Sequence, residues 1–196
     1  MNNILYGIPG LRKTILILQK ILFLIQYENY FPYTEKIYGL PIISFITNKK
    51  IKIGKNLVLI STSYFSDPGI NHPVIIRTLN QDAELIIGDN VGISGGRICC
   101  ANKVIIGNNV MFGANTFVTD TDFHPIDPLN RRDSSEKINT APVIIEDNVF
   151  LGMNVIVLKG VKIGKNSIIA AGSIVTREIE ENCIAAGIPA RKIKNL

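Results

Sequence analysis

The sequence predicts an all-β solenoid in which short parallel strands stack as a triangular coil. The first indication is a six-residue period, clearest from Ile145 onward as IEDNVF, LGMNVI, VLKGVK, IGKNSI, IAAGSI and VTREIE. The same register appears over residues 75–92, slips by one residue near Arg97, and resumes as CANKVI, IGNNVM and FGANTF. A period of six matches neither the helical period of about 3.6 nor the two-residue alternation of an ordinary strand. It is the spacing of successive faces in a repeat solenoid.

Two positions of each repeat supply the core. The aliphatic first residue and the small or β-branched fifth residue are expected to point inward and fill a narrow triangular interior. An amphipathic helix is excluded, because no window keeps apolar residues at i, i+3, i+4 and i+7. Glycine recurs at the second place, next to the bend between faces, where we expect its missing Cβ to permit conformations that other residues avoid. These glycines are Gly54, Gly88, Gly107, Gly113, Gly152 and Gly164.

Residues 1–50 lack this pattern and are predicted to form a helical capping segment and a linker. The stretch 11–27, LRKTILILQKILFLIQY, has helical length and is apolar almost all round. It is shorter than the roughly 20 residues of a membrane span and carries Lys20 in its middle. We expect it to cap the open end of the solenoid or to pack on a neighbouring subunit. The alternative is a helix that lies in the membrane interface and makes a peripheral contact there.

Composition points to one domain without a nucleic-acid partner. The chain has 196 residues, with 21 Lys and Arg against 16 Asp and Glu. Its cationic residues are scattered and lack interleaved aromatics, so RNA and DNA are not expected as ligands. The three cysteines, of which Cys99 and Cys100 are adjacent, fit neither a disulfide framework nor zinc spacing. They are predicted to fill the core as free thiols, which favours a reducing, cytoplasmic compartment.

Two insertions break the register, and such breaks are where solenoids carry function. The minor one is YFSDPGINHP, over residues 64–73, and the long one covers residues 119–142. The long insertion is polar and contains His124, near Asp120 and Asp122. Histidine exchanges a proton near neutral pH, and a carboxylate could orient one ring nitrogen while the other acts as a base.

Three segments carry a resemblance to a known family. They are DTDFHPID at residues 120–127, the run PVIIEDNVFLGMNVIVLKGVKIGKNSIIAAGSIVTREI, and AAGIPARKI near the C-terminus. Over about residues 51–194 the chain resembles the hexapeptide-repeat acyltransferases, in the maltose, galactoside and sugar O-acetyltransferase branch that includes enzymes of bacterial surface polysaccharides. The resemblance implies a left-handed parallel β-helix of about five to six coils over 51–182, with the active-site loop at 119–142. A C-terminal tail at 183–196 would carry basic residues that contact coenzyme A.

The resemblance also implies an activity. Acetyl-CoA would be the co-substrate, with no metal, and a sugar or oligosaccharide hydroxyl the acceptor. His124 would be the general base for direct attack on the thioester, oriented by Asp122 or Asp120, in a groove between subunits of a homotrimer. Ser94 and Asn115 would contact the acceptor.

The later coils would hold the cofactor. Phe150 stands where similar enzymes often have Trp, and two departures from the family pattern are Glu146 for Gly and Ile188 for Asn. Ile188 in place of Asn leaves undecided whether this turn contacts coenzyme A, although Gly187 and Pro189 keep the bend. The implied cofactor residues are Phe150, Gly152, Ala170, Ala171, Thr176, Arg177, Arg191 and Lys192.

Other functions stay open with less support. Amino-sugar N-acetylation and serine acetylation are the nearest alternatives, although serine acetyltransferases carry a helical domain larger than residues 1–50. A carbonic anhydrase would need three zinc-binding histidines, and the chain has only His72 and His124. A non-catalytic scaffold would not need the histidine loop. The acceptor sugar, its carbon and an acyl group larger than acetyl are left undetermined.

Overall fold

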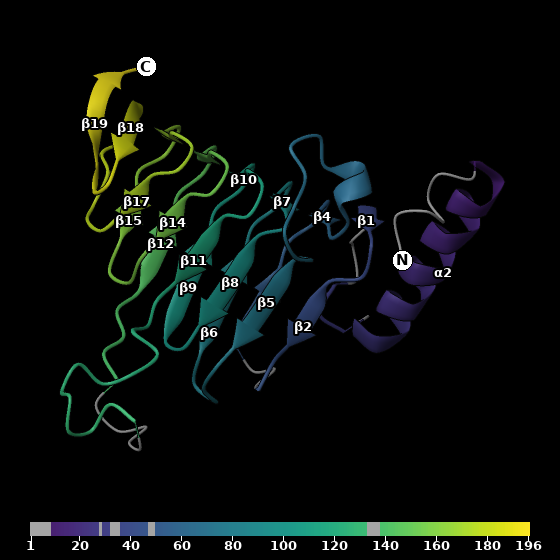
Figure 1. Cartoon of the computed structure of the whole chain (residues 1–196), viewed down its shortest axis with the longest axis horizontal. Coiled ribbons are helices and arrows are strands. Elements are labelled where there is room, and N and C mark those ends of the chain that lie inside the picture. Colours follow the sequence, from purple (N-terminus) through teal and green to yellow (C-terminus); the bar gives the residue numbers. More distant parts are fainter. Residues whose placement is uncertain (1–8, 28, 32–35, 47–49, 133–137) are drawn as a thin grey trace.

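The chain folds as a triangular solenoid with one helix at its N-terminal end and a hairpin at its C-terminal end (Figure 1). The computed structural model describes residues 9–27, 29–31, 36–46, 50–132 and 138–196. Three sheets, here called A, B and C, form the walls, and the pairing between successive coils is parallel. The expected fold class, a left-handed parallel β-helix with an N-terminal helical segment and a protruding loop, is confirmed.

Each turn of the chain adds one strand to sheet A, then one to sheet B, then one to sheet C. Sheet A contains β1 (Lys36–Tyr38), β4 (Val58–Ile60), β7 (Gly92–Ser94), β10 (Met111–Phe112), β13 (Phe150–Leu151), β16 (Ile168–Ile169), β18 (Cys183–Gly187) and β19 (Ala190–Asn195). Sheet B contains β2 (Ile42–Ser44), β5 (Ile75–Thr78), β8 (Arg97–Cys100), β11 (Phe117–Thr119), β14 (Ile156–Val157) and β17 (Ile174–Val175). Sheet C contains β3 (Ile51–Ile53), β6 (Glu84–Ile87), β9 (Lys103–Ile106), β12 (Val143–Ile145) and β15 (Lys162–Ile163).

The core follows the six-residue period. In the six repeats that begin at Ile145, the first and fifth residues are all buried, as expected for side chains that point into the prism. The intervening strand residues point outward and form straight rows, because parallel partners stand in register from coil to coil. The outer faces therefore display side chains that are distant in sequence but adjacent in space.

One corner of the prism is held by a ladder of asparagines. Where the chain passes from sheet C to sheet A, each coil has an asparagine with a left-handed backbone. Each side-chain Nδ2 donates to the Oδ1 of the asparagine in the next coil, at 2.7 to 3.0 Å. Asparagine tolerates this conformation better than other side chains, so one residue provides both the left-handed bend and the hydrogen bond to the next coil. The ladder consists of Asn56, Asn90, Asn109, Asn148, Asn166 and Asn182.

The glycines at the second place of the repeat are needed for close packing, not for the special backbone conformation that was expected. None of them has a positive φ. Instead, the next coil passes too close for a side chain: a Cβ on Gly107 would lie 2.4 Å from Asp147 Oδ1 and 2.7 Å from its backbone nitrogen. The left-handed positions are taken by asparagine and by glycines elsewhere in the repeat.

The solenoid starts earlier than the expected boundary at residue 51. Strand β1 pairs with β4, and β2 pairs with β5, so residues 36–44 already form part of a coil. Ile37 and Ile43 are buried and stand six residues apart, which is the same period. Gly39 and Pro41, residue types that are common in linkers, occupy the bend between β1 and β2 instead.

Helix α2 (Pro9–Tyr27) lies against this first coil. Phe23 is buried and packs edge-on against Phe31, and the Tyr27 hydroxyl donates to the Ile43 carbonyl at 3.1 Å. The opposite face of α2 exposes six aliphatic side chains. No helix among the described residues is long and apolar enough to cross a membrane. The exposed aliphatic residues of α2 are Leu11, Ile17, Leu18, Ile21, Leu22 and Ile25.

The adjacent cysteines take different places. Cys100 fills the core, and burial, together with the nearby Asp120 carboxylate, raises the pKa of its thiol to about 12. Cys99 points outward from sheet B and is only half-buried, so the expectation that it fills the core is wrong. The cause is the two-residue alternation of β8, which sends neighbouring side chains to opposite faces.

The close approach of the coils can be tested at glycine. Gly107→Ala should reduce the free energy of unfolding by about 1–3 kcal/mol, because the new methyl group would overlap the backbone of the next coil. Gly92→Ala is the matched control, since a Cβ there meets nothing within 4 Å. It should instead stabilise the strand by about 0.5 kcal/mol. Urea unfolding measures both, and equal effects would contradict the close-packing explanation.

Candidate active site

The long loop projects from the edge where sheet B passes to sheet C (Figure 1). It leaves after β11 and returns just before β12, and Thr121 and Thr140 form an antiparallel bridge at its base. The Asp122 amide donates to the Asn139 carbonyl at 3.1 Å. The loop is therefore pinned at both ends, with His124 exposed beyond the base.

Asp120 anchors the start of this loop. Its side chain is fully buried and accepts hydrogen bonds from the backbone amides of Ala101, Asn102 and Lys103 at 2.7, 2.7 and 2.6 Å. A carboxylate with three amide donors is fully engaged with the preceding coil. In this arrangement Asp120 holds the loop on the solenoid, rather than contacting the imidazole of His124.

Asp122 is also engaged. Its Oδ1 accepts a hydrogen bond from Lys159 Nζ at 2.6 Å, which ties the loop to the following coil. His124 makes no hydrogen bond or ion pair with any residue that the structure describes. Neither aspartate therefore orients the imidazole in the single chain.

The expected acceptor contacts lie at the other edge of sheet B. Ser94 ends β7 and Asn115 lies in the bend between β10 and β11, and the second insertion covers both. Their partners are Ser66, whose Oγ lies 3.1 Å from Ser94 Oγ, and Asn71, whose amide donates to Asn115 Oδ1 at 2.8 Å. This insertion, which includes the 3₁₀ turn η1 (Ser63–Phe65), was noted in the sequence only as a minor break.

Most expected cofactor residues gather along the same edge. Gly152 and Ala171 are stacked so closely that a Cβ on the glycine would lie 2.6 Å from the alanine amide nitrogen. Ala170 precedes this contact and donates its amide to the Ala185 carbonyl at 2.9 Å. Phe150 is 40% exposed on the outer face of sheet A. Phe150, Gly152, Ala170 and Ala171 together form a strip along the A–B edge, in which an exposed aromatic ring lies beside closely packed backbone.

The expected phosphate contacts are divided between two places. Arg191 and Lys192 lie on β19 beside the hairpin bend that continues the A–B edge. Lys192 is ion-paired with Glu180, whereas Arg191 donates, within the part of the chain that the structure describes, only to the neighbouring Ala190 carbonyl. Thr176 and Arg177 follow β17, at the opposite edge of sheet B. The single chain thus does not bring all four together.

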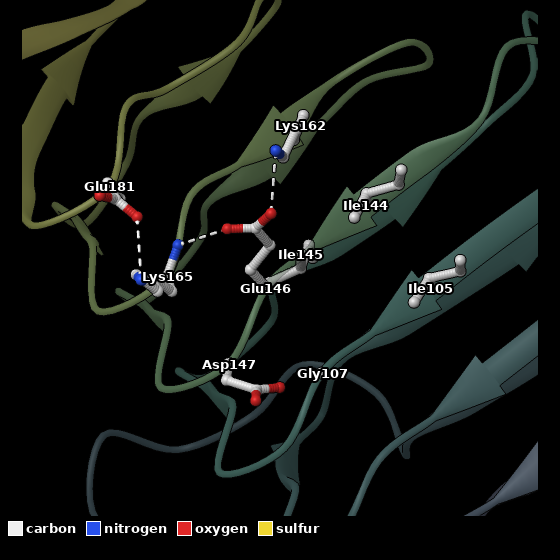
Figure 2. Close-up of a pocket in the computed structure, with 9 residues that line it drawn as sticks. All are labelled: Ile105, Gly107, Ile144, Ile145, Glu146, Asp147, Lys162, Lys165 and Glu181. Atoms are coloured by element: carbon white, nitrogen blue, oxygen red, sulfur yellow. Dashed lines mark hydrogen bonds and ion pairs between the residues drawn. The ribbon is translucent and has the colours of Figure 1, made fainter.

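A separate hollow of about 480 Å³ lies on the outer face of sheet C (Figure 2). Glu146, the departure from the family pattern, contacts Lys162 at 2.9 Å and accepts from the Lys165 amide at 2.9 Å. The Lys162 hydrogen bond lowers the pKa of Glu146. Lys165 Nζ in turn lies 3.4 Å from Glu181. Because these charges neutralise one another and His124 lies elsewhere, the hollow is a poorer catalytic candidate than the loop.

Across the described ranges, no group of three or more His, Cys, Asp and Glu side chains is arranged to hold a metal ion.

Residues 103–119 and 142–177 match the family model described as the hexapeptide repeat of succinyl-transferase. These residues therefore carry the hexapeptide repeat. The galactoside O-acetyltransferase of Lactococcus lactis is 47% identical over 95 residues, 47% of this chain and 44% of that enzyme. The Escherichia coli galactoside O-acetyltransferase is 40% identical over 93 residues, again 47% and 44%. The resemblance to the sugar O-acetyltransferase branch is confirmed, although the matches span less than half of these relatives.

Solved structures extend the likeness over more of the chain. A polysialic acid O-acetyltransferase is 25% identical, with a TM-score of 0.55, and the match covers 83% of this chain and 88% of that protein. The N-acyltransferase AntD from Bacillus cereus has a TM-score of 0.60 at 21% identity, over 81% and 79%. The second likeness supports the fold alone.

The structural role of Asp120 can be separated from a catalytic one. Asp120→Asn should reduce the free energy of unfolding by about 2–3 kcal/mol, because an amide cannot accept from all three backbone donors. Asp122→Asn should cost less than about 1 kcal/mol, since its partner Lys159 lies at the partly exposed surface. Urea unfolding compares the two. An Asp120→Asn protein of native stability that loses turnover would contradict the structural role.

Proposed function

We propose that the protein is an acetyl-CoA-dependent O-acetyltransferase that acts on a hydroxyl of a sugar or surface-polysaccharide precursor. The observation that carries the proposal is His124, exposed on a loop whose first residues are tied to the coils on either side. The galactoside O-acetyltransferases and the polysialic acid O-acetyltransferase among the similar proteins support this reaction class.

His124 acts as the general base in this proposal. Its free ring nitrogen takes the proton of the acceptor hydroxyl as the oxygen attacks the thioester carbonyl of acetyl-CoA. The tetrahedral intermediate then collapses, the C–S bond breaks, and the imidazolium returns its proton to the coenzyme A thiolate. No acyl-enzyme is needed, because both substrates are held at one point.

Acetyl-CoA is assigned to the A–B edge. The closely packed backbone at Gly152, Ala170 and Ala171 suits the pantetheine arm, whose amides would pair with the exposed backbone of Ala171. Phe150 offers an exposed ring beside it. Arg191 and Lys192 would hold phosphate at the far end, with Thr176 and Arg177 as further phosphate contacts.

The division of these groups between two edges supports a homotrimer. His124 belongs to the B–C edge and the acetyl-CoA strip to the A–B edge, so the width of sheet B separates them within one subunit. We propose that each active site combines the loop of one subunit with the strip of its neighbour, in a closed ring of three. Ser94 and Asn115 would contact the acceptor in that groove.

We also propose a cytoplasmic location with a peripheral contact at the inner face of the membrane. The exposed face of α2 is aliphatic, and the helix carries Arg12, Lys13 and Lys20 but no acidic residue. This combination suits an anionic lipid surface. Sedimentation with anionic vesicles, compared between native and Ile21→Asp protein, tests the contact.

His124→Ala should lower turnover by roughly 10² to 10⁴, the usual contribution of a positioned general base. Assembly and acetyl-CoA affinity should be unchanged, because the core does not use the exposed imidazole. A coenzyme A release assay measures turnover across sugars, amino sugars, oligosaccharides and serine, and so separates O- from N-acetylation. Turnover within a few-fold of native would mean that the proton goes elsewhere.

Replacing Arg191 and Lys192 with Ala should raise the KM for acetyl-CoA about tenfold or more, through the loss of charge-assisted phosphate contacts. The acceptor KM should be nearly unchanged. Lys194→Ala removes a neighbouring exposed cation on β19 and serves as the control. If dephospho-CoA and coenzyme A bind the native protein equally well, the phosphate assignment is wrong.

The shared site can be tested by mixing two inactive variants. His124→Ala disables the loop, and Ala171→Trp should block the acetyl-CoA strip. When the two are unfolded, mixed and refolded, hybrid trimers should recover part of the native activity, because some grooves combine an intact loop with an intact strip. If one subunit held a whole site, every subunit would carry a defect and mixing would restore nothing.

A further inference from the structure

The outer face of sheet B next to the His124 loop carries a stack of charged and aromatic side chains. In register, Arg97 on β8 stands between Ile75 on β5 and Phe117 on β11. Its guanidinium carbon lies 4.8 Å from the centre of the Phe117 ring. On the loop side, Phe117 stacks on Phe123, with ring centres 6.3 Å apart and planes at 20°. The stack therefore leads from Arg97 to the residue directly before His124.

A second arginine joins this face. Arg77 on β5 is exposed and stands in register with Cys99, two residues after Arg97. Burial raises the pKa of the Cys99 thiol, while the positive charges of Arg77 and Arg97 act in the opposite direction. Both guanidinium groups thus lie within electrostatic reach of one sulfur atom. The Asp120 carboxylate also acts on this thiol, but it is already bound by three backbone amides.

The two arginines are not neutralised within the chain. Every ion pair among the described residues uses lysine. Neither Arg77 nor Arg97 forms an ion pair or a hydrogen bond with a described residue, and Arg97 Nε is buried without a partner. A guanidinium held against a ring, with its hydrogen bonds unused, is preorganised for an external anion, and arginine binds carboxylate and phosphate through two parallel hydrogen bonds.

We propose that Arg97 and Arg77 form a subsite for a negatively charged group on the acceptor sugar, with the exposed ring of Phe123 against the sugar itself. The inference rests on the proposed function, because His124 defines where the acceptor reacts. The charged group is the carboxylate of an acidic sugar or the phosphate of a phosphorylated or nucleotide-linked sugar. The enzyme would then select an anionic acceptor rather than a neutral galactoside.

The test compares acceptors that differ in charge. Coenzyme A release is measured with a sialic acid oligosaccharide, a nucleotide sugar and a neutral galactoside, on native protein, Arg97→Gln and Arg77→Gln. The KM for the charged acceptor should rise about tenfold to a hundredfold in Arg97→Gln, and less in Arg77→Gln. The values for the neutral sugar and for acetyl-CoA should stay within about twofold. Whichever charged sugar responds identifies the anion as carboxylate or phosphate.

Two controls keep the test specific. Lys52→Gln removes one positive charge from the outer face of sheet C and should change none of these constants. Arg97→Lys keeps the charge but loses the planar pair of donors, so it should recover only part of the affinity. It also replaces Arg97→Gln if that variant fails to fold.

Direct binding separates this inference from the proposed function. Calorimetry with the charged sugar alone should show binding that Arg97→Gln weakens. Such binding without acetyl transfer to any acceptor would contradict the proposed function but support the subsite. Two outcomes would overturn the subsite: an unchanged preference for charged over neutral acceptors in both arginine variants, or a rise in the KM for acetyl-CoA, which would assign the arginines to the cofactor.

Discussion

The stacking of one coil on the next is the constraint on which the rest of the structure depends. Parallel backbone hydrogen bonds join the strands, and the asparagine ladder from Asn56 to Asn182 joins the bends at one corner. Because the ladder repeats once per coil, the bend has the same shape each time. If one coil slipped by one residue relative to the next, its core side chains would point outward and its asparagine would leave the ladder. The same register therefore serves both the core and the ladder.

This stacking also decides what the surface can do. Side chains that are one coil apart in sequence align in rows, so a strip such as Gly152 and Ala171 forms without any folded pocket. The faces are wide, however, and residues at opposite edges of one sheet remain apart. The chain therefore offers two partial surfaces, one with His124 and one with closely packed backbone, and a rigid prism cannot fold to join them.

The interior of the solenoid was predictable from the sequence, whereas contacts between coils were not. The six-residue period identified the inward positions from Ile145 onward, because every repeat has the same kinds of residue at its first and fifth positions. The engagement of Asp120 depends on which backbone amides the preceding coil presents, and no local pattern carries that information. The early start at Lys36 did leave a signal, the six-residue spacing of Ile37 and Ile43, but Pro41 obscured it.

The way in which the long loop joins the solenoid has an evolutionary consequence. The chain departs and returns through the bridge between Thr121 and Thr140, and the carboxylates of Asp120 and Asp122 fasten it to the coils on either side. Among the described residues, those beyond this clasp belong to no strand of the solenoid. Lengthening such a segment costs little chain entropy. Insertions and replacements there can accumulate without disturbing the repeats. Substrate range is thus free to diverge in descendants of this chain while the scaffold that carries it is inherited unchanged.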